Sequence, residues 1–295
     1  MGKCMKALFI ASAAIVTFFL VLLVVTLISN GGRLTNRVTN THGISDTFSR
    51  VSIETKTADV VILRSEDGVA RVVCYEDPKI KNEVSVEEGT LRIKRVDTRR
   101  WYEYILFSFG KTEITVYLPE TEYEALSVKA STGDITVRDT NASDLKIALS
   151  TGDVSLSGMK TGKATVTSST GDISLKSISA SGDIALTAST GNASVTDVTV
   201  SGELSIMRST GNVTLTNTQA DTFTVETDTG NVRFSASDAK EIYVVTDTGN
   251  VKGTFLTNKI FFVRTDTGRI DVPKTTVGGR CEITTDTGDI IITVD

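Results

Sequence analysis

The sequence predicts an all-β fold: a single-stack parallel β-helix, or β-solenoid, of about 19–20 residues per coil, preceded by one transmembrane helix. Three observations carry this prediction. A glycine-centred turn motif recurs nine times, apolar columns alternate on both sides of it, and one long uncharged apolar run lies near the amino terminus. Recurrence at a fixed short period is the signature of a solenoid.

The turn motif reads Ser-Thr-Gly-Asp, Ser-Thr-Gly-Asn, Asp-Thr-Gly-Asn, Asp-Thr-Gly-Arg or Asp-Thr-Gly-Asp, and its glycines follow one another at intervals of 19 or 20 residues. Glycine suits a tight turn because it adopts a positive φ at no steric cost. A neighbouring Asp or Asn caps N–H groups of the turn. The predicted structural turn glycines are Gly133, Gly152, Gly171, Gly191, Gly211, Gly230, Gly249, Gly268 and Gly288.

Apolar side chains recur at four fixed distances from each glycine: seven and five residues before it, and two and four residues after it. Of these 36 positions only Gly253 lacks an apolar side chain. This period-2 alternation predicts a strand on each side of the turn. Coils this short cannot bury their own inner face, so they stack about 4.8 Å apart and pair with the coils above and below. Antiparallel hairpins within each repeat are the weaker alternative, because the period is nearly constant. The regular coils are expected over residues 126–295, wound right-handed as most parallel crossovers are.

The amino-terminal region predicts a membrane anchor. Residues 7–28 form a run of 22 residues without charge, about the 20 helical residues that cross a bilayer core and longer than the apolar run of a cleaved signal peptide. We expect a cytoplasmic tail over 1–6, a transmembrane signal anchor in the lipid bilayer over 7–28, and a flexible linker over 29–46. Basic residues flank the run on both sides, so they do not decide how the helix is oriented in the membrane. The orientation is predicted instead from residues 30–295, which are the only domain that has to be placed on one side. The chain is therefore expected at the cell membrane, single-pass, with its carboxy-terminal domain extracytoplasmic.

Residues 47–125 lack the motif, yet Thr57-Ala58-Asp59 resembles a degenerate turn, and strand patterns continue at 69–75, 84–86, 91–96 and 113–118. This region predicts irregular first coils that cap the rod. It also holds an aromatic cluster that is either a flap over the end of the core or an exposed contact with a membrane or partner: Trp101, Tyr102, Tyr104, Phe107 and Phe109.

Composition excludes several classes of function. The net charge of −5 argues against a nucleic-acid partner. The one histidine, His42, has no accompanying ligand cluster. Of the three cysteines, Cys4 precedes the apolar run, while Cys74 and Cys281 lie in strand patterns, with Cys281 in a core column. We expect two buried thiols rather than a disulfide framework, and no cofactor.

Acidic residues occupy the turns at about one per coil, which reads as solvated turns that limit repulsion between stacked charges. A weak candidate metal ladder is the column Asp228, Asp247, Asp266 and Asp286. Calcium takes six to eight oxygens, and one carboxylate per turn is sparse, so no metal is expected.

Three segments carry a family resemblance: Val116-Tyr117-Leu118-Pro119, Tyr123-Glu124-Ala125-Leu126-Ser127-Val128, and Ser131-Thr132-Gly133-Asp134-Ile135 together with the eight later repeats of this turn. The chain resembles the bacterial putative-adhesin domain family of unknown function, which includes LiaG-like membrane-anchored β-helix proteins, over residues 48 to 295. The resemblance implies a parallel β-helix facing the cell exterior, in surface or envelope-stress roles. It supplies no catalytic residues.

Three functions compete at this stage. The leading prediction is a non-catalytic, adhesin-like interaction module whose partner is an envelope protein or glycan. The alternative is an accessory component of cell-envelope stress sensing or signalling. A carbohydrate-active β-helix enzyme is the third, and it is disfavoured because catalysis needs convergent groups in a cleft, whereas these acids repeat with the coil.

Overall fold

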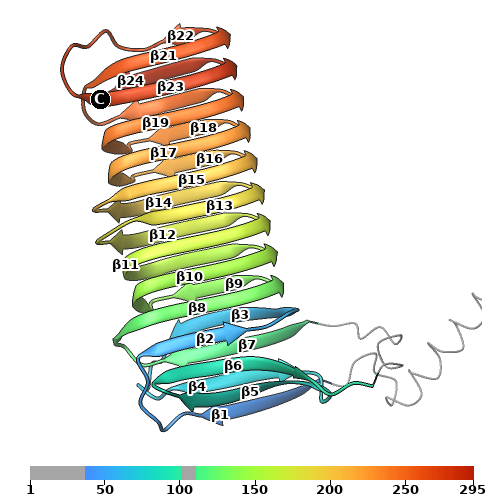
Figure 1. The fold of residues 1–295 in the computed structure, drawn as a ribbon. Coiled ribbons are helices and arrows are strands. Elements are labelled where there is room, and N and C mark those ends of the chain that lie inside the picture. Colours follow the sequence, from blue (N-terminus) through green and yellow to red (C-terminus); the bar gives the residue numbers. More distant parts are fainter. Residues whose placement is uncertain (1–36, 101–110) are drawn as a thin grey trace, which may run out of the picture.

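The computed structural model describes residues 37–100 and 111–295, and throughout that part the chain is built from strands (Figure 1). The predicted anchor over 7–28 and the aromatic cluster over 101–109 lie outside the described residues. Within the described ranges, no helix has the length and apolar character needed to cross a bilayer.

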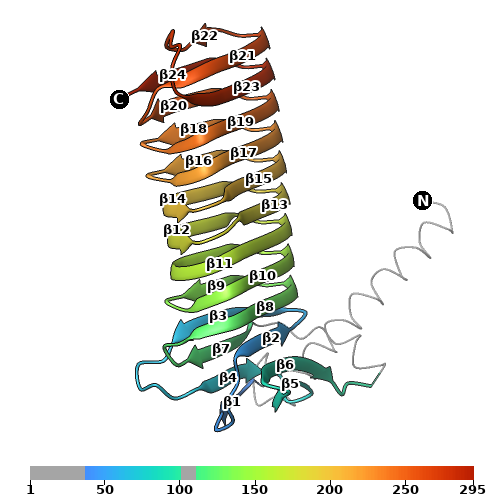
Figure 2. The ribbon, with the colours of Figure 1, turned by 60° about the vertical axis from the view of Figure 1, so that its left-hand side comes forward.

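The regular part is a rod of stacked parallel coils (Figures 1 and 2), which confirms the predicted β-solenoid. Each coil has one wall before its signature glycine and a second wall after it. The first wall contains β8 (Glu122–Thr132), β10 (Asn141–Thr151), the second half of β11 (Val154–Thr170), β13 (Ile184–Thr190), β15 (Glu203–Thr210), β17 (Gln219–Thr229), β19 (Asp238–Thr248), β21 (Lys259–Thr267) and β23 (Gly279–Thr287). The second wall contains β9 (Ile135–Arg138), the first half of β11, β12 (Ile173–Ala180), β14 (Ala193–Val200), β16 (Val213–Thr216), β18 (Val232–Ser235), β20 (Val251–Phe255), β22 (Ile270–Asp271) and β24 (Ile290–Val294).

The register of the walls matches the predicted columns. Ile147, for example, pairs with Val128 in the coil below and with Val166 in the coil above. All three are at most 1% exposed. Parallel pairing in this register stacks each apolar column on itself, so the core runs as a continuous apolar rod along the length of the solenoid.

The order of the last coils departs from the order of the chain. Strand β23 pairs on one side with β19 and on the other with β21. Strand β24 likewise lies between β20 and β22. The final coil of the sequence is therefore inserted before the penultimate one, and the coil of β21 and β22 forms the outer end of the rod. The alignment of columns alone did not predict this exchange, because both coils carry the same apolar pattern.

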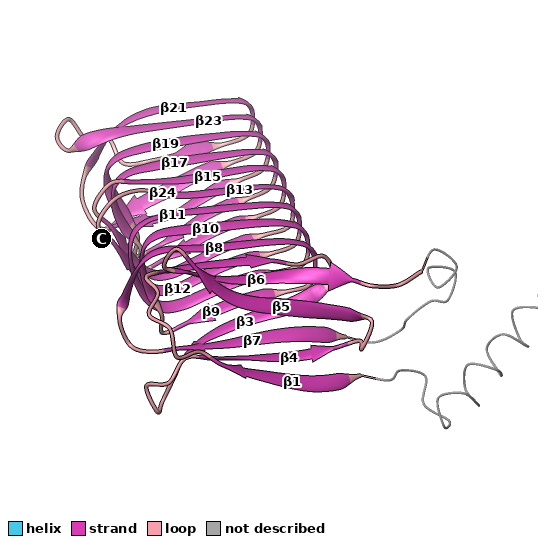
Figure 3. Ribbon diagram, turned by 60° about the horizontal axis from the view of Figure 1, so that its bottom comes forward, coloured by secondary structure: helices cyan, strands magenta, loops and turns pink. Residues whose placement is uncertain are grey.

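The amino-terminal end is closed differently (Figure 3). Strands β2 (Arg50–Glu54) and β3 (Ala58–Arg64) form a parallel coil directly beneath β8 and β9, and β6 (Thr90–Asp97) and β7 (Thr112–Leu118) continue the stack. Antiparallel strands then complete this end: β4 (Arg71–Glu76) pairs with β7, and β5 (Ile80–Glu87) pairs with β6. The strand patterns predicted at 69–75, 84–86, 91–96 and 113–118 are confirmed, and the cap is partly solenoid and partly antiparallel sheet.

One boundary of the predicted linker is wrong. Residues Val38–Gly43 form strand β1, which pairs antiparallel with β4 along its whole length. The polar, glycine-containing composition of residues 29–46 suggested a tether, but an edge strand needs only one half-buried face. The second half of the expected linker is thus part of the folded cap.

A second corner of each coil lies six residues after the signature glycine. A left-handed backbone conformation occurs there in six successive coils, at Asp139, Gly158, Ser177, Asp197, Asn217 and Ala236. Five of these are not glycine, and Asp and Asn are the residues that tolerate this conformation best. This corner turns the second wall back toward the first, and no single residue type marked it in the sequence.

Candidate interaction surfaces

Glycine is required at the signature positions mainly because neighbouring coils come too close for a Cβ atom, and less because of the backbone φ angle. A Cβ atom on Gly171 would lie 1.9 Å from the carbonyl oxygen of Gly152, and the other eight positions show comparable clashes with the neighbouring coil. Gly230 and Gly249 are not in the left-handed region, yet their added Cβ atoms would meet a carbonyl oxygen at 2.0 and 1.9 Å. Any side chain in this column would therefore force stacked turns apart.

The residue after each signature glycine, together with Asp59 after Ala58, forms a hydrogen-bonded ladder along the rod. Except at Arg269, its side-chain Oδ1 accepts the backbone N–H of the equivalent residue in the next coil, over N···O distances of 2.7 to 3.0 Å. In spatial order the ladder runs through Asp59, Asp134, Asp153, Asp172, Asn192, Asn212, Asn231, Asn250, Asp289 and Arg269. The predicted capping role of these side chains is thus between coils rather than within one turn.

Arg269 explains why the last two coils exchange places. A guanidinium only donates hydrogen bonds, so Arg269 cannot cap a following coil. In the exchanged order it has no following coil, and Asp289 Oδ1 accepts its backbone N–H at 3.0 Å. In the order of the chain, Arg269 would have to accept from Asp289, which its side chain cannot do.

The candidate metal column does not converge on a site. Asp228, Asp247, Asp266 and Asp286 are all exposed, and in space Asp286 stands between Asp247 and Asp266. In the part of the chain that the structure describes, no group of three or more His, Cys, Asp or Glu side chains is placed to hold a metal ion. Asp266 instead accepts a hydrogen bond from Arg264 at 2.9 Å.

A column three residues before the glycine, buried except at the half-buried Thr265 of the end coil, caps the turn carbonyls. Threonine hydroxyls here donate to glycine carbonyl oxygens of the neighbouring coil, at 2.9 to 3.3 Å, from Thr227, Thr246, Thr265 and Thr285. Arg208 occupies the same column and donates from Nη1 to Gly191 O. Its other guanidinium nitrogens, Nε and Nη2, are buried without a hydrogen-bond partner, and burial lowers the pKa of this side chain.

The exposed corner beside this column is a row of threonines, one before each signature glycine and each paired in register with the next. They are Thr132, Thr151, Thr170, Thr190, Thr210, Thr229, Thr248, Thr287 and Thr267 in spatial order. Together with outward Ser, Thr and Lys side chains on the two walls, they give the rod long polar faces. These faces have the repeat spacing of the coils, about 4.8 Å.

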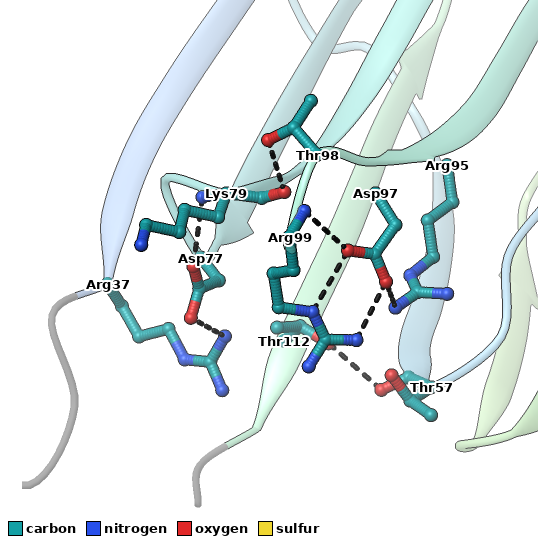
Figure 4. A network of polar contacts seen from close by, with 9 residues as sticks. All are labelled: Arg37, Thr57, Asp77, Lys79, Arg95, Asp97, Thr98, Arg99 and Thr112. Atoms are coloured by element: carbon teal, nitrogen blue, oxygen red, sulfur yellow. Dashed lines mark hydrogen bonds and ion pairs between the residues drawn. The ribbon is translucent and has the colours of Figure 1, made fainter. Parts of the chain in front are cut away.

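A polar network joins the strand ends at the amino-terminal end of the rod (Figure 4). The Asp97 carboxylate accepts hydrogen bonds from Arg99 at 2.7 and 2.9 Å and from Arg95 at 3.0 Å. The hydrogen bond from Arg99 is the main cause that lowers the pKa of Asp97 to about 2. Arg37 forms an ion pair with Asp77 at 3.6 Å. The network therefore fixes the strand ends that adjoin residues 1–36 and 101–110.

A cavity of about 580 Å³ lies at the other end of the rod, next to the inserted coil. Beside it, the ammonium of Lys259 pairs with Asp238 at 2.5 Å, and their side chains are only 2% and 10% exposed. These two residues belong to coils that flank the inserted coil. Gly279 passes between those coils, with room for no side chain: a Cβ there would lie 1.7 Å from Lys240 O. The buried ion pair and the glycine thus clamp the exchanged order.

The two thiols in the described part of the chain are free and buried, as predicted. Burial raises the pKa of both Cys74 and Cys281 to about 12. A thiol in this state is unreactive, since the thiolate is the nucleophile. Both therefore act as small core side chains.

The glycine-centred turns, the stacked walls and the ladder define a family as well as a fold. The Toastrack DUF4097 family matches residues 48–206 and 179–295. The chain belongs to the Toastrack DUF4097 family. The two matches overlap within the repeats, as expected where successive coils are alike. No curated protein sequence matches the chain significantly.

Comparison with solved structures found similar chains. A putative adhesin from Bacteroides fragilis superimposes with a TM-score of 0.50 at 17% identity, over 88% of this chain and 97% of that one. A putative adhesin from Parabacteroides distasonis gives a TM-score of 0.47 at 12% identity, over 87% and 97% of the two chains. A putative lipid binding protein from the same species gives 0.47 at 18% identity, over 87% and 96%. At 17% identity, the likeness to the Bacteroides fragilis protein shows the fold alone.

Three features were not predicted from the sequence: the ladder between coils, the exchanged order, and the clamp of Asp238 and Lys259. A signal for each was present. The ladder is indicated by the column of Asp and Asn after the glycine. The exchanged order is indicated by Arg269 within that column. The clamp is indicated by Gly278-Gly279 and by an apolar strand that begins with lysine.

Proposed function

We propose that this Toastrack chain is a non-catalytic, extracytoplasmic interaction module, held at the cell membrane by a helix over residues 7–28. Its proposed partner is an envelope protein or a glycan. The observation that carries the proposal is the ladder, which commits a column of turn acids to holding the coils together. Their carboxylate oxygens accept backbone N–H groups, so they are not arranged to transfer protons to a substrate. What the rod offers its surroundings is its long polar faces.

Chain connectivity supports the proposed orientation. Arg37 lies at the capped end of the rod, nine residues after the apolar run. Nine extended residues reach about 30 Å at most, so the capped end would be the membrane-proximal one and the coil of β21 and β22 the distal tip. The putative adhesin from Bacteroides fragilis, which has this fold, favours a surface role. The transmembrane helix and the right-handed winding stay predictions.

The proposed topology can be tested with a single reporter thiol in intact cells. Thr190→Cys places a thiol in the exposed threonine row, whereas Cys74 and Cys281 are buried and should stay silent. A membrane-impermeant maleimide should label the variant in intact cells and leave the wild type unlabelled. Cys4 should react only after permeabilisation. Labelling of Thr190→Cys only after permeabilisation would overturn the extracytoplasmic assignment, and recovery of the chain in the soluble fraction would overturn the anchor.

The interaction role needs a separate measurement. An impermeant amine-reactive cross-linker applied to intact cells should join outward lysines of the walls, such as Lys146 and Lys176, to a defined envelope component. Lys146→Arg and Lys176→Arg keep the charge and remove the reactive amine, so they should lose their adducts. A chain that forms no adduct from either wall in its native envelope would contradict the proposed role.

A further inference from the structure

The two ends of the rod differ in how their backbone edges are covered. At the amino-terminal end, β4 and β5 pair antiparallel with β7 and β6. At the other end, β21 pairs only with β23 and β22 only with β24 among the described residues. The outer edges of β21 and β22 therefore present backbone N–H and C=O groups, which make such an edge a template for another strand.

The core columns are also uncovered at this tip. Ile270 is 44% exposed, although its counterparts Val251 and Ile290 in the two coils beneath are fully buried. Phe261 and Val263 are only partly buried, and Val277 in the adjoining loop is 63% exposed. The tip thus combines an open edge with apolar surface, as an association surface does.

The charges of the two edge strands are self-complementary under a twofold axis. On β21, the outward-facing Arg264 and Asp266 flank Thr265. In the next wall, Arg269 directly before β22 and Asp271 within it flank Ile270. In an antiparallel pair centred on Thr265, Arg264 would face Asp266 of the second copy. The same pairing centred on Ile270 would set Arg269 opposite Asp271. Opposite charges placed directly across an antiparallel pair are favourable.

One twofold axis would serve both centres. Thr265 and Ile270 stand at equal distances along the chain on either side of the Thr267–Gly268 turn. The axis would be normal to one wall at Thr265 and would meet the other wall at Ile270. A single rotation then pairs β21 with its copy and β22 with its copy.

The free backbone groups agree with this register. The carbonyls of Thr267 and Arg269 accept from Gly288 and Ile290 of the inserted coil. Because alternate residues of a strand direct their N–H and C=O to opposite sides, Arg264, Asp266 and Ile270 direct theirs to the open edge. These are the residues that would be hydrogen-bonded pairs in the twofold arrangement.

We propose that the tip formed by β21 and β22 is a homodimerisation surface, at which a second copy of this chain adds its own β21 and β22 antiparallel across a twofold axis. The arrangement closes after two copies, because the opposite end of each rod is covered. The two rods would be collinear, with their capped ends farthest apart. This inference names one partner, a second copy of the chain, for the proposed interaction role. It rests on the proposed function only in that respect.

The test is sedimentation velocity of the full chain in detergent micelles, across a concentration series. Asp266→Arg sets arginine opposite Arg264 of the second copy and should weaken dimerisation about tenfold or more. The matched control is Asp247→Arg, the same change in the same exposed column of an interior coil, which should leave the dimer unchanged. The double variant Arg264→Asp with Asp266→Arg restores opposite charges across the axis and should dimerise as the wild type does.

An experiment that mixes wild-type and double-variant chains distinguishes dimerisation through the β21 and β22 tip from dimerisation through another surface. In a heterodimer of wild type and double variant, the wild-type Arg264 would face a guanidinium and the wild-type Asp266 would face a carboxylate. Differently labelled wild-type and double-variant chains should therefore form homodimers and few heterodimers, because like charges directly opposite are destabilising.

Three outcomes would overturn the proposal. The first is a wild type that stays monomeric at about 100 μM, a concentration at which even a complex of micromolar Kd forms. The others are free mixing of the two chains and a dimer that Asp266→Arg does not weaken. Dimerisation through the predicted membrane helix would show as free mixing. The topology and cross-linking measurements above are independent of each outcome, so the proposed function can stand if the dimer fails.

Discussion

The two ends of this solenoid solve the same problem in different ways. A stack of identical coils has no intrinsic end, because the last coil always leaves an unpaired strand edge to which another coil can add. At the amino-terminal end, antiparallel strands β1, β4 and β5 stop the stack. At the other end, the chain folds back so that a coil with Arg269 in the ladder column comes last. One end is closed by added strands, and the other ends where the acceptor side chain of the ladder is missing.

The largest expected effect concerns the buried interior between the two ends. Val166 is fully buried between Ile147 and Leu186, so Val166→Asp should lower the free energy of unfolding by at least about 3 kcal/mol through burial of an unpaired carboxylate. Its neighbour Thr167 is exposed, and Thr167→Asp should cost less than about 0.5 kcal/mol. Urea denaturation of the two variants measures both. Equal midpoints would mean that the inward and outward faces are wrongly assigned.

The second prediction separates the two ends directly. Gly279→Ala would place a Cβ 1.7 Å from Lys240 O in the clamp, and overpacking of this kind costs about 1–3 kcal/mol. Gly43→Ala in strand β1 meets nothing within 4 Å and should be neutral. Hydrogen exchange should show faster opening of 259–294 in Gly279→Ala, with the amino-terminal cap unchanged. Loss of protection at both ends together would contradict independent opening of the two ends.

The ladder gives a third, smaller contrast between an interior coil and the end coil. Asn231 accepts the N–H of Asn250 at 2.9 Å, so Asn231→Ala leaves that donor uncapped and should cost about 1 kcal/mol. Arg269→Ala removes no acceptor, because its side chain caps no coil, and the stability should change by less than about 0.5 kcal/mol. Thermal unfolding of both variants checks this. A larger loss at Arg269 than at Asn231 would contradict the end position of its coil.

The smallest effect has the opposite sign. Arg208→Thr converts a buried, partly unsatisfied guanidinium into the residue that caps glycine carbonyls in four other coils. Replacement of a buried charge by an uncharged side chain is often neutral or stabilising, and we expect a gain of less than about 1 kcal/mol. Arg208→Lys serves as the control, since it keeps the buried charge. Destabilisation by Arg208→Thr would show that the guanidinium has a favourable partner at this position.

The amino-acid pattern was enough to assign which residues face inward and where each coil turns. The side chains of Val166 and Thr167 differ enough in transfer free energy to settle the faces of a strand, and Gly171 marks its turn because a Cβ there would strike the coil below. The order of the coils and the closure of the two ends became visible only in three dimensions. The apolar columns of equivalent coils are interchangeable, so burial cannot rank the coil of Gly268 against that of Gly288. That choice depends on directional contacts between coils, namely the donor-only side chain of Arg269 and the ion pair of Asp238 with Lys259.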